Sequence, residues 1–290
     1  MVKIRVPATS ANVGVGFDCL GIALNLYTYF TFEETSEFKI TGTDLKFQNK
    51  RNLVYTSFMK TLEILGKTVQ EIAIHMDSNV PVSRGLGSSA TCVVGGVLGA
   101  YALTNTPIDK KKILDICTAI EGHPDNVAPA IYGGLIASYQ SEDEVYSVSY
   151  NIDERFLFLA MIPDFETRTK DARKVLPDVL PYATAVRNSA KLSVVLKGFE
   201  TYDINILKNA MKDEIHEPYR KALIHEYQQV KELCETIESV CFYISGSGST
   251  LMNVIEHEAL VPAFEKELSK LTHKWQCVLL KTDKEGACIC

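Results

Sequence analysis

The chain has 290 residues, a hydrophobic content of 46% and a formal net charge of −6 at pH 7. This composition is enough to bury a core and excludes a disordered chain, and the acidic balance without a basic run argues against a nucleic acid or an anionic membrane as partner. The sequence contains neither a recognisable signal peptide nor an apolar run long enough to span a bilayer, so we expect a cytoplasmic protein.

Strands and helices are both predicted over the first half of the chain. The strands follow from period-two alternation or from β-branched and aromatic content, and they comprise residues 2–6 (ending at Pro7), 22–34 and 72–76. Residues 88–103 are small and apolar, which is typical of a buried helix whose glycines let neighbouring backbones approach closely. A second helix is predicted over 107–121, with Pro107 in its first turn and Gly122 at its end.

The second half of the chain begins after the polar stretch 141–153, where we place a boundary between residues 1–152 and 153–290. Its continuous apolar run at 156–162 predicts a central strand. Helical spacing predicts one helix over 219–238. The remaining predicted elements are two strands at 242–245 and 250–255, which flank a glycine turn, and a helix at 262–271. Because the βαβ rhythm of a doubly wound sheet is absent, the elements predict the α+β class.

A glycine- and serine-rich loop links the third predicted strand to the first predicted helix. It reads Pro81-Val-Ser-Arg84-Gly85-Leu86-Gly87-Ser88-Ser89-Ala90-Thr91. The first turn of a helix presents unpaired N–H groups and a partial positive charge, which suits a phosphate, and glycines leave no side chain between loop and ligand. The same pattern fits a capped helix that binds nothing. It is neither a Walker A loop nor a Rossmann fingerprint.

Together with three other segments, this loop carries a family resemblance. It resembles the second motif of the galactokinase–homoserine kinase–mevalonate kinase–phosphomevalonate kinase (GHMP) superfamily. Residues 7–21 (PATSANVGVGFDCLG) resemble the first motif in its homoserine kinase form, residues 244–250 (ISGSGST) resemble the third, and residues 121–129 (EGHPDNVAP) agree as well. The resemblance implies the GHMP-kinase fold, with an amino-terminal subdomain like domain 2 of ribosomal protein S5, a ferredoxin-like carboxyl-terminal subdomain and the site between them.

The resemblance also implies the ligands of the donor side, ATP and Mg²⁺. The residues that match nucleotide-binding positions are Asn52, Pro81, Arg84, Gly85, Leu86, Gly87, Ser88, Ser89, Ala90 and Thr91. Ser89 and Glu121 match the positions that share the Mg²⁺, an ion that prefers hard oxygen ligands. From its place at a helix end alone, Glu121 also fits a solvated carboxylate.

On the acceptor side, the resemblance implies L-homoserine. Residues matching Thr169, Arg173 and Arg220 surround the substrate carboxylate, Asn12 and Asp18 lie at its amino end, and His123 and Asn126 lie near the acceptor hydroxyl. Arginine forks suit a carboxylate. From the residues alone, each basic side chain also fits a solvated charge, and His123 also fits a turn residue bonded to a neighbouring carbonyl.

The general base is the open point of the implied chemistry. Several members of the superfamily place an aspartate against the acceptor hydroxyl, but the matching position here is Asn126, and asparagine is no base. We expect the side chain of Asp125 to point elsewhere. Catalysis is therefore expected to rest on positioning and charge stabilisation, with Asn126, Glu121 and Ser89 as catalytic residues.

The expected function is ATP-dependent phosphorylation of L-homoserine to O-phospho-L-homoserine, a step of threonine biosynthesis. Two alternatives stay open: another GHMP kinase acting on a mevalonate-like or sugar substrate, and a non-catalytic nucleotide-binding relative. The resemblance also suggests a homodimer, although no interface can be derived from the sequence.

Overall fold

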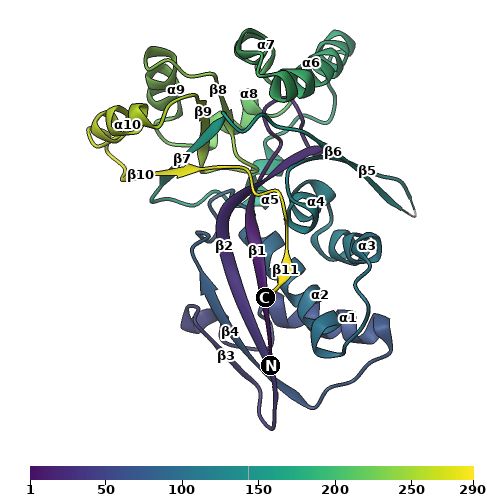
Figure 1. Ribbon diagram of the computed structural model, residues 1–290. Helices are drawn as coiled ribbons and strands as arrows, with labels where there is room; N and C mark the ends of the chain where they lie inside the picture. Colours follow the sequence, from purple (N-terminus) through teal and green to yellow (C-terminus); the bar gives the residue numbers. More distant parts are fainter. Residues whose placement is uncertain (143) are drawn as a thin grey trace.

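In the computed structural model, residues 1–142 and 144–290 are described, and they form an α+β structure around two β-sheets (Figure 1). The first sheet has the order β11-β1-β2-β4-β3, and β5 and β6 extend it from β2. Its strands are β1 (Val2–Ala11), β2 (Leu20–Thr35), β3 (Lys39–Thr41), β4 (Glu71–Ser78), β5 (Leu135–Gln140), β6 (Val145–Tyr150) and β11 (Cys288–Ile289). The β3–β4 pair is parallel and the other pairs are antiparallel. The predicted α+β class is confirmed.

One face of this sheet is covered by helices (Figure 1). They are α1 (Leu53–Leu65), α2 (Ser88–Leu103), α3 (Lys110–Glu121) and α4 (Pro124–Tyr132), with the short 3₁₀ helix η1 (Leu45–Phe47) before α1. α2 has the bounds that its small residues predict, and it is buried between α1 and β1. A Cβ atom added to Gly96 would lie 2.4 Å from the carbonyl oxygen of Val54 in α1, so this position requires glycine.

The second sheet is antiparallel and has the order β10-β7-β9-β8. Its strands are β7 (Leu157–Pro163), β8 (Cys241–Ile244), β9 (Leu251–Ile255) and β10 (Trp275–Leu280). The helices of this half are α5 (Thr169–Lys174), α6 (Tyr182–Thr201), α7 (Ile204–Ala210), α8 (Glu217–Arg220), α9 (Tyr227–Thr236) and α10 (Val261–Leu268), with η2 (Lys221–Leu223) and η3 (Glu258–Leu260). β7 lies inside the sheet, as its apolar run predicts.

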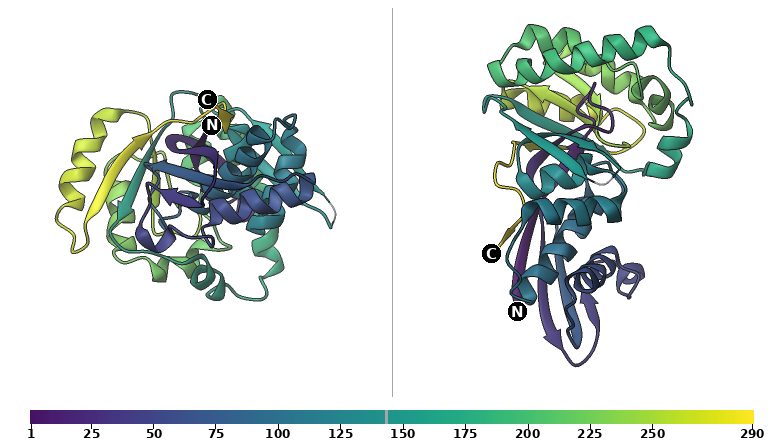
Figure 2. Two further views of the ribbon diagram at one scale, coloured as in Figure 1. Left: turned by 90° about the horizontal axis from the view of Figure 1, so that it is seen from below. Right: turned by 90° about the vertical axis from the view of Figure 1, so that its right-hand side faces the viewer.

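Side chains of the two sheets pack against each other in one hydrophobic core. One cluster of buried side chains includes Ile22 and Leu24 of β2 together with Phe158 of β7 and Val254 of β9. The last strand, β11, returns to the first sheet and pairs with β1, so both chain ends lie side by side (Figure 2). The division of the chain between residues 152 and 153 stays a prediction.

Three predicted boundaries are wrong for local reasons. β1 continues through Pro7 to Ala11, because the register with β2 shifts between Pro7 and Ala8 and this irregularity accommodates a residue without an N–H. α3 begins at Lys110 and not at Pro107, because the Asp109 side chain accepts hydrogen bonds from the backbone N–H groups of Lys111 and Lys112 and caps the helix. α10 ends at Leu268 and not at residue 271.

The single helix predicted over 219–238 is also wrong. The chain forms α8 and η2, then takes an extended conformation at Ile224 and a positive φ of 61° at Glu226, before α9 begins at Tyr227. The Glu226 carboxylate accepts hydrogen bonds from the Thr272 N–H (2.6 Å) and the Trp275 indole N–H (2.9 Å). These tertiary hydrogen bonds hold the break, and helical spacing cannot reveal them.

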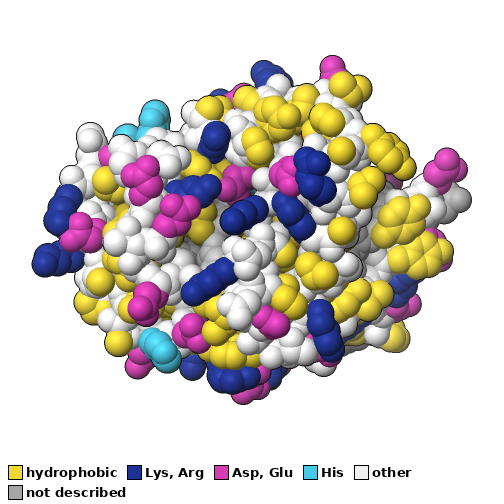
Figure 3. All heavy atoms as spheres, turned by 90° about the horizontal axis from the view of Figure 1, so that it is seen from above, with side chains coloured by type: hydrophobic (Ala, Val, Ile, Leu, Met, Phe, Trp, Pro, Cys, Tyr) yellow, Lys and Arg dark blue, Asp and Glu magenta, His cyan; other side chains and the backbone are white. Residues whose placement is uncertain are grey.

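Within the described residues, no helix combines the length and the apolar character needed to cross a bilayer. The face seen from above in Figure 3 carries basic and acidic side chains interspersed, without a field of one sign. This distribution agrees with the net charge of −6.

Candidate active site

The glycine- and serine-rich loop leads from β4 into the first turn of α2. Gly85 and Gly87 have positive φ angles of 76° and 70°, a conformation that side-chain-bearing residues rarely adopt. A Cβ atom at Gly85 would lie 2.2 Å from the carbonyl oxygen of Ser245, and one at Gly87 would lie 2.0 Å from the Thr9 Oγ1. Both glycines are therefore required by backbone angle and by packing.

Hydrogen bonds tie this loop to the first and third sequence motifs. The Thr9 N–H donates to the Leu86 carbonyl (3.2 Å), and the Thr250 N–H donates to the Arg84 carbonyl (3.1 Å). The Ser245 hydroxyl donates to the Gly85 carbonyl (2.6 Å). Three motifs that lie far apart in the sequence thus form one loop cluster.

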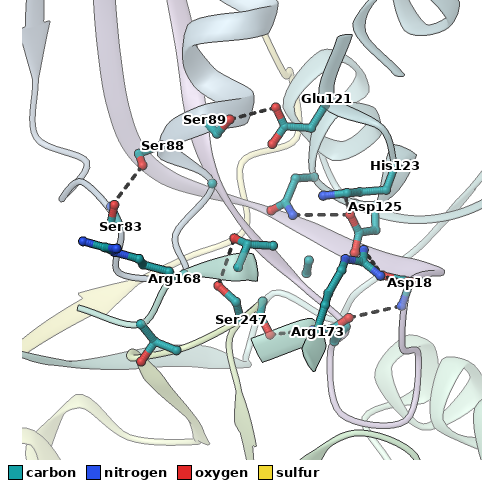
Figure 4. Close-up of a pocket in the computed structure, with 18 of the residues that line it drawn as sticks. Asp18, Ser83, Ser88, Ser89, Glu121, His123, Asp125, Arg168, Arg173 and Ser247 are labelled. Atoms are coloured by element: carbon teal, nitrogen blue, oxygen red, sulfur yellow. Dashed lines mark hydrogen bonds and ion pairs between the residues drawn. The ribbon is translucent and has the colours of Figure 1, made fainter. Parts of the chain in front are cut away.

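A cavity of about 480 Å³ opens over this cluster (Figure 4). Most of the residues that the sequence assigned to the site line it, and they are Asn12, Asp18, Gly85, Gly87, Ser88, Ser89, Glu121, His123, Asn126, Thr169, Arg173 and Arg220. They come from β1 and the loop after it, the start of α2, the end of α3, the start of α4, and α5 and α8. The structure therefore brings the donor-side and acceptor-side candidates to one cavity.

Several assigned nucleotide-binding residues do not line this cavity, and they are Asn52, Pro81, Arg84, Leu86, Ala90 and Thr91. Leu86 and Ala90 are buried in the core, and the Thr91 hydroxyl donates to the Ser88 carbonyl. Asn52 caps α1 by accepting a hydrogen bond from the Val54 N–H (3.0 Å), and it borders a separate hollow. In this structure, the side chains of Leu86, Ala90, Thr91 and Asn52 contact other parts of the protein and do not face the cavity.

Arg84 points to the second sheet. Its Nε donates to the Pro163 carbonyl (3.0 Å) and its Nη2 donates to the Asp164 carbonyl (3.1 Å). Nη1 lies 3.4 Å from the Glu166 carboxylate. Arg84 therefore connects the loop of the first sheet with the end of β7.

On the wall beside the first turn of α2, Ser89 and Glu121 face each other. The Ser89 hydroxyl donates to the Glu121 Oε2 at 2.8 Å (Figure 4). Burial raises the pKa of Glu121, and the hydrogen bond from Ser89 opposes this effect. The Glu121 carboxylate, at the end of α3, and the Ser89 hydroxyl, in the first turn of α2, together present hard oxygen ligands that suit Mg²⁺. Across the described residues, no group of three or more His, Cys, Asp or Glu side chains could hold a metal ion by itself.

Three polar side chains, His123, Asp125 and Asn126, follow at the start of α4. His123 Nδ1 lies 2.6 Å from Asp125 Oδ1, and this contact raises the pKa of His123. The Asn126 amide is held on both sides, because its Oδ1 accepts from the Thr9 hydroxyl (2.8 Å) and its Nδ2 donates to Asp125 Oδ1 (3.3 Å). The expectation that Asp125 points elsewhere is wrong: Asp125 lines the cavity and orients both neighbours.

At the opposite wall, Asp18 and Arg173 form a bidentate ion pair. Both nitrogen–oxygen distances are 2.9 Å, and each side chain remains partly accessible (Figure 4). Asn12 supports this wall from behind, because its Oδ1 accepts from the Asp18 N–H (3.1 Å) and its Nδ2 donates to the Gly246 carbonyl (2.7 Å). Asn12 is thus a positioning residue for the loop that carries Asp18.

Arg220 lies deeper and is only 3% exposed. Its Nε donates to the Ala172 carbonyl (3.1 Å), its Nη1 donates to the Gly246 carbonyl (3.0 Å), and the guanidinium lies over the Phe17 ring. Burial lowers the pKa of Arg220 to about 10. Within the described residues no carboxylate lies at ion-pair distance from it. A buried cation without such a partner favours the binding of an anionic group.

The structure adds residues that the sequence assignment missed, namely Ser83, Asp125, Thr167, Arg168, Gly246 and Ser247. Arg168 lies on the Ser83 side of the cavity, and Ser247 approaches Thr169 with a hydroxyl–hydroxyl distance of 3.4 Å (Figure 4). Arg168 directly precedes the predicted site residue Thr169, and Ser247 lies in the segment 244–250 that the sequence analysis selected. Only their direction was not predictable, because it depends on the backbone of α5 and of the glycine turn.

Comparisons with known proteins identify the family to which the chain is similar. The family model of the GHMP kinases N terminal domain matches residues 52–134. A homoserine kinase of Clostridium botulinum (strain Kyoto / Type A2) is 40% identical over 294 residues, which cover 100% of this chain and 98% of the relative. A homoserine kinase of Clostridium acetobutylicum is 39% identical and covers 100% of both chains.

Solved structures are similar over the whole chain as well. The homoserine kinase of Cytophaga hutchinsonii superposes with a TM-score of 0.88 at 27% identity, covering 100% of this chain and 97% of the other. The mevalonate kinase of Methanococcus jannaschii has a TM-score of 0.73 at 13% identity, covering 97% and 98% of the two chains. The latter similarity concerns the fold alone.

Proposed function

The chain belongs to the homoserine kinase family of the GHMP kinases, and on this basis we propose that it transfers the γ-phosphoryl group of ATP to the hydroxyl of L-homoserine. The product is O-phospho-L-homoserine, the intermediate expected for threonine biosynthesis. One observation carries the choice of acceptor. An aspartate, Asp18, and two arginines, Arg173 and Arg220, line the same cavity as the glycine- and serine-rich loop of residues 81–91, which we now call the phosphate loop.

An α-amino acid is a zwitterion, and these residues offer a partner to each of its charges. Asp18 suits the ammonium, whereas Arg173 and Arg220 suit the carboxylate. Without a ligand, Asp18 and Arg173 neutralise each other at 2.9 Å. A zwitterion can replace this ion pair by two new pairs, so that every charge keeps a partner. An acceptor that lacks the ammonium would leave Asp18 without a charged partner. An acceptor that lacks the carboxylate would leave Arg220 without one.

The donor side supports ATP. Gly85, Gly87 and Ser88 line the cavity at the amino terminus of α2, where backbone N–H groups and the helix dipole favour a triphosphate. Mg²⁺ belongs to the proposal: Ser89 and Glu121 would hold it, and it would supply positive charge beside the transferred phosphoryl group.

The chain's own residues supply positioning and charge. The acceptor hydroxyl has to lie between the phosphate loop and Asn126, whose amide is fixed by Thr9 and Asp125 and keeps one N–H for the substrate. His123 stands beside it, and the contact with Asp125 raises the pKa of His123, which favours its positively charged form near the transferred group. Asp125 Oδ1 is engaged by His123 and Asn126, so this oxygen holds both neighbours in place.

The test is an ADP-release assay over a panel of alcohols: L-homoserine, 4-hydroxybutyrate (which lacks the ammonium) and mevalonate. We expect L-homoserine to exceed 4-hydroxybutyrate in kcat/KM by roughly 10-fold, since a charge-assisted hydrogen bond from the ammonium to the partly exposed Asp18 is worth about 1.5 kcal/mol. A preference for mevalonate, or no preference, would contradict the proposed acceptor. Binding of an ATP analogue without turnover of any alcohol would indicate the non-catalytic alternative.

A further inference from the structure

A second hollow adjoins the cavity on its acceptor side. It has a volume of about 620 Å³ and is lined by Asp18, Cys19, Glu121, Gly122, His123, Pro124, Ser138, Tyr139, Gln140 and Arg173. We call it the β5 hollow, because Ser138, Tyr139 and Gln140 form the end of β5. Of the residues assigned to the nucleotide, none lines the β5 hollow.

The cavity and the β5 hollow meet at four shared residues, which are Asp18, Glu121, His123 and Arg173. The bidentate ion pair between Asp18 and Arg173 therefore stands at the boundary, accessible from both sides. The phosphate-loop residues Gly85, Gly87 and Ser88 line the cavity alone. The phosphate-loop residues thus belong to the cavity alone, whereas Glu121, the proposed Mg²⁺ ligand, borders both spaces.

β5 holds this second side in place by regular strand pairing. Leu20 pairs with Ala137, and the Ser138 N–H donates to the Cys19 carbonyl (2.9 Å), next to Asp18. Ser138 is 4% exposed, and its hydroxyl has no hydrogen-bond partner among the residues that the structure describes. A buried hydroxyl without a partner is unusual and costs stability unless a ligand or water satisfies it. Gln140, by contrast, is exposed at the rim.

We propose that the β5 hollow is the route by which the acceptor reaches the Asp18–Arg173 ion pair, with Ser138 and Gln140 as specificity-determining contacts along it. This inference rests on the proposed function and adds a route and two residues to it. A nucleotide seated on the phosphate loop occupies the other side of the cavity, so the acceptor must approach from the far side of the γ-phosphate. The acceptor can then bind and the product can leave while a nucleotide stays bound.

The first test narrows the rim. Gln140→Trp adds a large ring at an exposed position, and the matched control Val148→Trp adds the same ring to an exposed position of β6 that lines neither space. For Gln140→Trp we expect the KM for L-homoserine to rise about tenfold, with the KM for ATP and the melting temperature unchanged. Val148→Trp should leave all three values unchanged.

The second test removes the unpartnered hydroxyl. Ser138→Ala should raise the KM for L-homoserine roughly 3- to 10-fold, the value of one hydrogen bond, without lowering the melting temperature. A purely structural role of Ser138 would instead lower the melting temperature and leave the KM unchanged.

The outcomes separate the two proposals. Absence of turnover with L-homoserine in the unaltered protein overturns the proposed function. Normal turnover combined with an unchanged homoserine KM in both Gln140→Trp and Ser138→Ala overturns the acceptor route. An equal rise in the KM for ATP and for homoserine in Gln140→Trp also overturns it, because the two ligands would then share one opening.

Discussion

At the scale of single residues, Glu121 illustrates how position decides chemistry. It ends α3, where the helix dipole disfavours an acid, and burial raises its pKa further. Its side-chain hydrogen bond comes from the Ser89 hydroxyl, and no lysine or arginine of the described chain pairs with it. A carboxylate held in this way is stabilised by a bound cation, which is the basis for proposing it as an Mg²⁺ ligand.

We therefore expect Glu121→Gln to act on metal dependence more than on folding. The Mg²⁺ concentration for half-maximal activity should rise about tenfold or more and kcat should fall by roughly 100-fold, because one charged ligand is lost. The free energy of unfolding should not decrease, since a partly buried charge without a cationic partner is removed. Glu63→Gln, at an exposed position of α1, is the control. An unchanged Mg²⁺ titration would refute the assignment.

At the scale of elements, the segment before α8 decides where Arg220 lies. The Asp213 Oδ2 accepts hydrogen bonds from the N–H groups of Ile215 (3.1 Å), His216 (2.7 Å) and Glu217 (2.8 Å) and so starts the short helix. Glu217 accepts a short hydrogen bond from Tyr227 of α9, and burial raises its pKa to about 7. The element that carries Arg220, a proposed substrate-binding residue, is thus tied to a carboxyl group whose pKa is raised to about 7.

The raised pKa of Glu217 predicts how the free energy of unfolding changes with pH. The folded protein keeps the Glu217 proton up to about pH 7, whereas the unfolded chain releases it near the ordinary value of 4.5. The free energy of unfolding therefore falls as the pH rises between these values. Glu217→Gln should abolish this decrease and be more stable at pH 8 by up to about 3 kcal/mol, with little difference at pH 4.5.

Urea unfolding of both proteins at several pH values is the measurement for Glu217. Glu235→Gln, an exposed position on the neighbouring helix α9, should retain the pH dependence of the unaltered protein. Parallel pH profiles for the Glu217→Gln variant and the unaltered protein would show that burial of Glu217 does not control stability.

At the scale of the whole molecule, the site lies where the two sheets meet. Arg84 connects the phosphate loop of the first sheet with residues Pro163 and Asp164 of the second, and its side chain is only 16% exposed. Asp18 and Arg173 make a second connection across the cavity. These contacts set the distance between donor and acceptor sides. The expected homodimer stays a prediction.

Arg84→Met distinguishes this connecting role from the direct nucleotide contact predicted from the sequence. Loss of the connection should lower the free energy of unfolding by about 1–3 kcal/mol and weaken binding of a non-hydrolysable ATP analogue in parallel. Calorimetric titration and urea unfolding measure the two effects, with Lys60→Met on the outer surface of α1 as control. Weakened nucleotide binding at unchanged stability would favour the direct contact instead.

The sequence alone determined the features that depend on neighbouring residues. The bounds of α2 and the α+β class follow from local composition and periodicity, and the motif resemblance supplied the candidate acceptor residues. Only the tertiary structure decided the rest. It turned Arg84 away from the cavity and Asp125 into it, and it broke the helix predicted over 219–238 at Glu226.

The physical reason is that side-chain direction depends on partners distant in sequence. Asp18 meets Arg173 across 155 positions, Glu226 accepts hydrogen bonds from residues 46 and 49 positions later, and the Ser138 hydroxyl lies beside the Asp18 loop only because β5 pairs with β2. Local patterns specify which backbone can form at each place. The packing of the two sheets specifies which side chains then face one another.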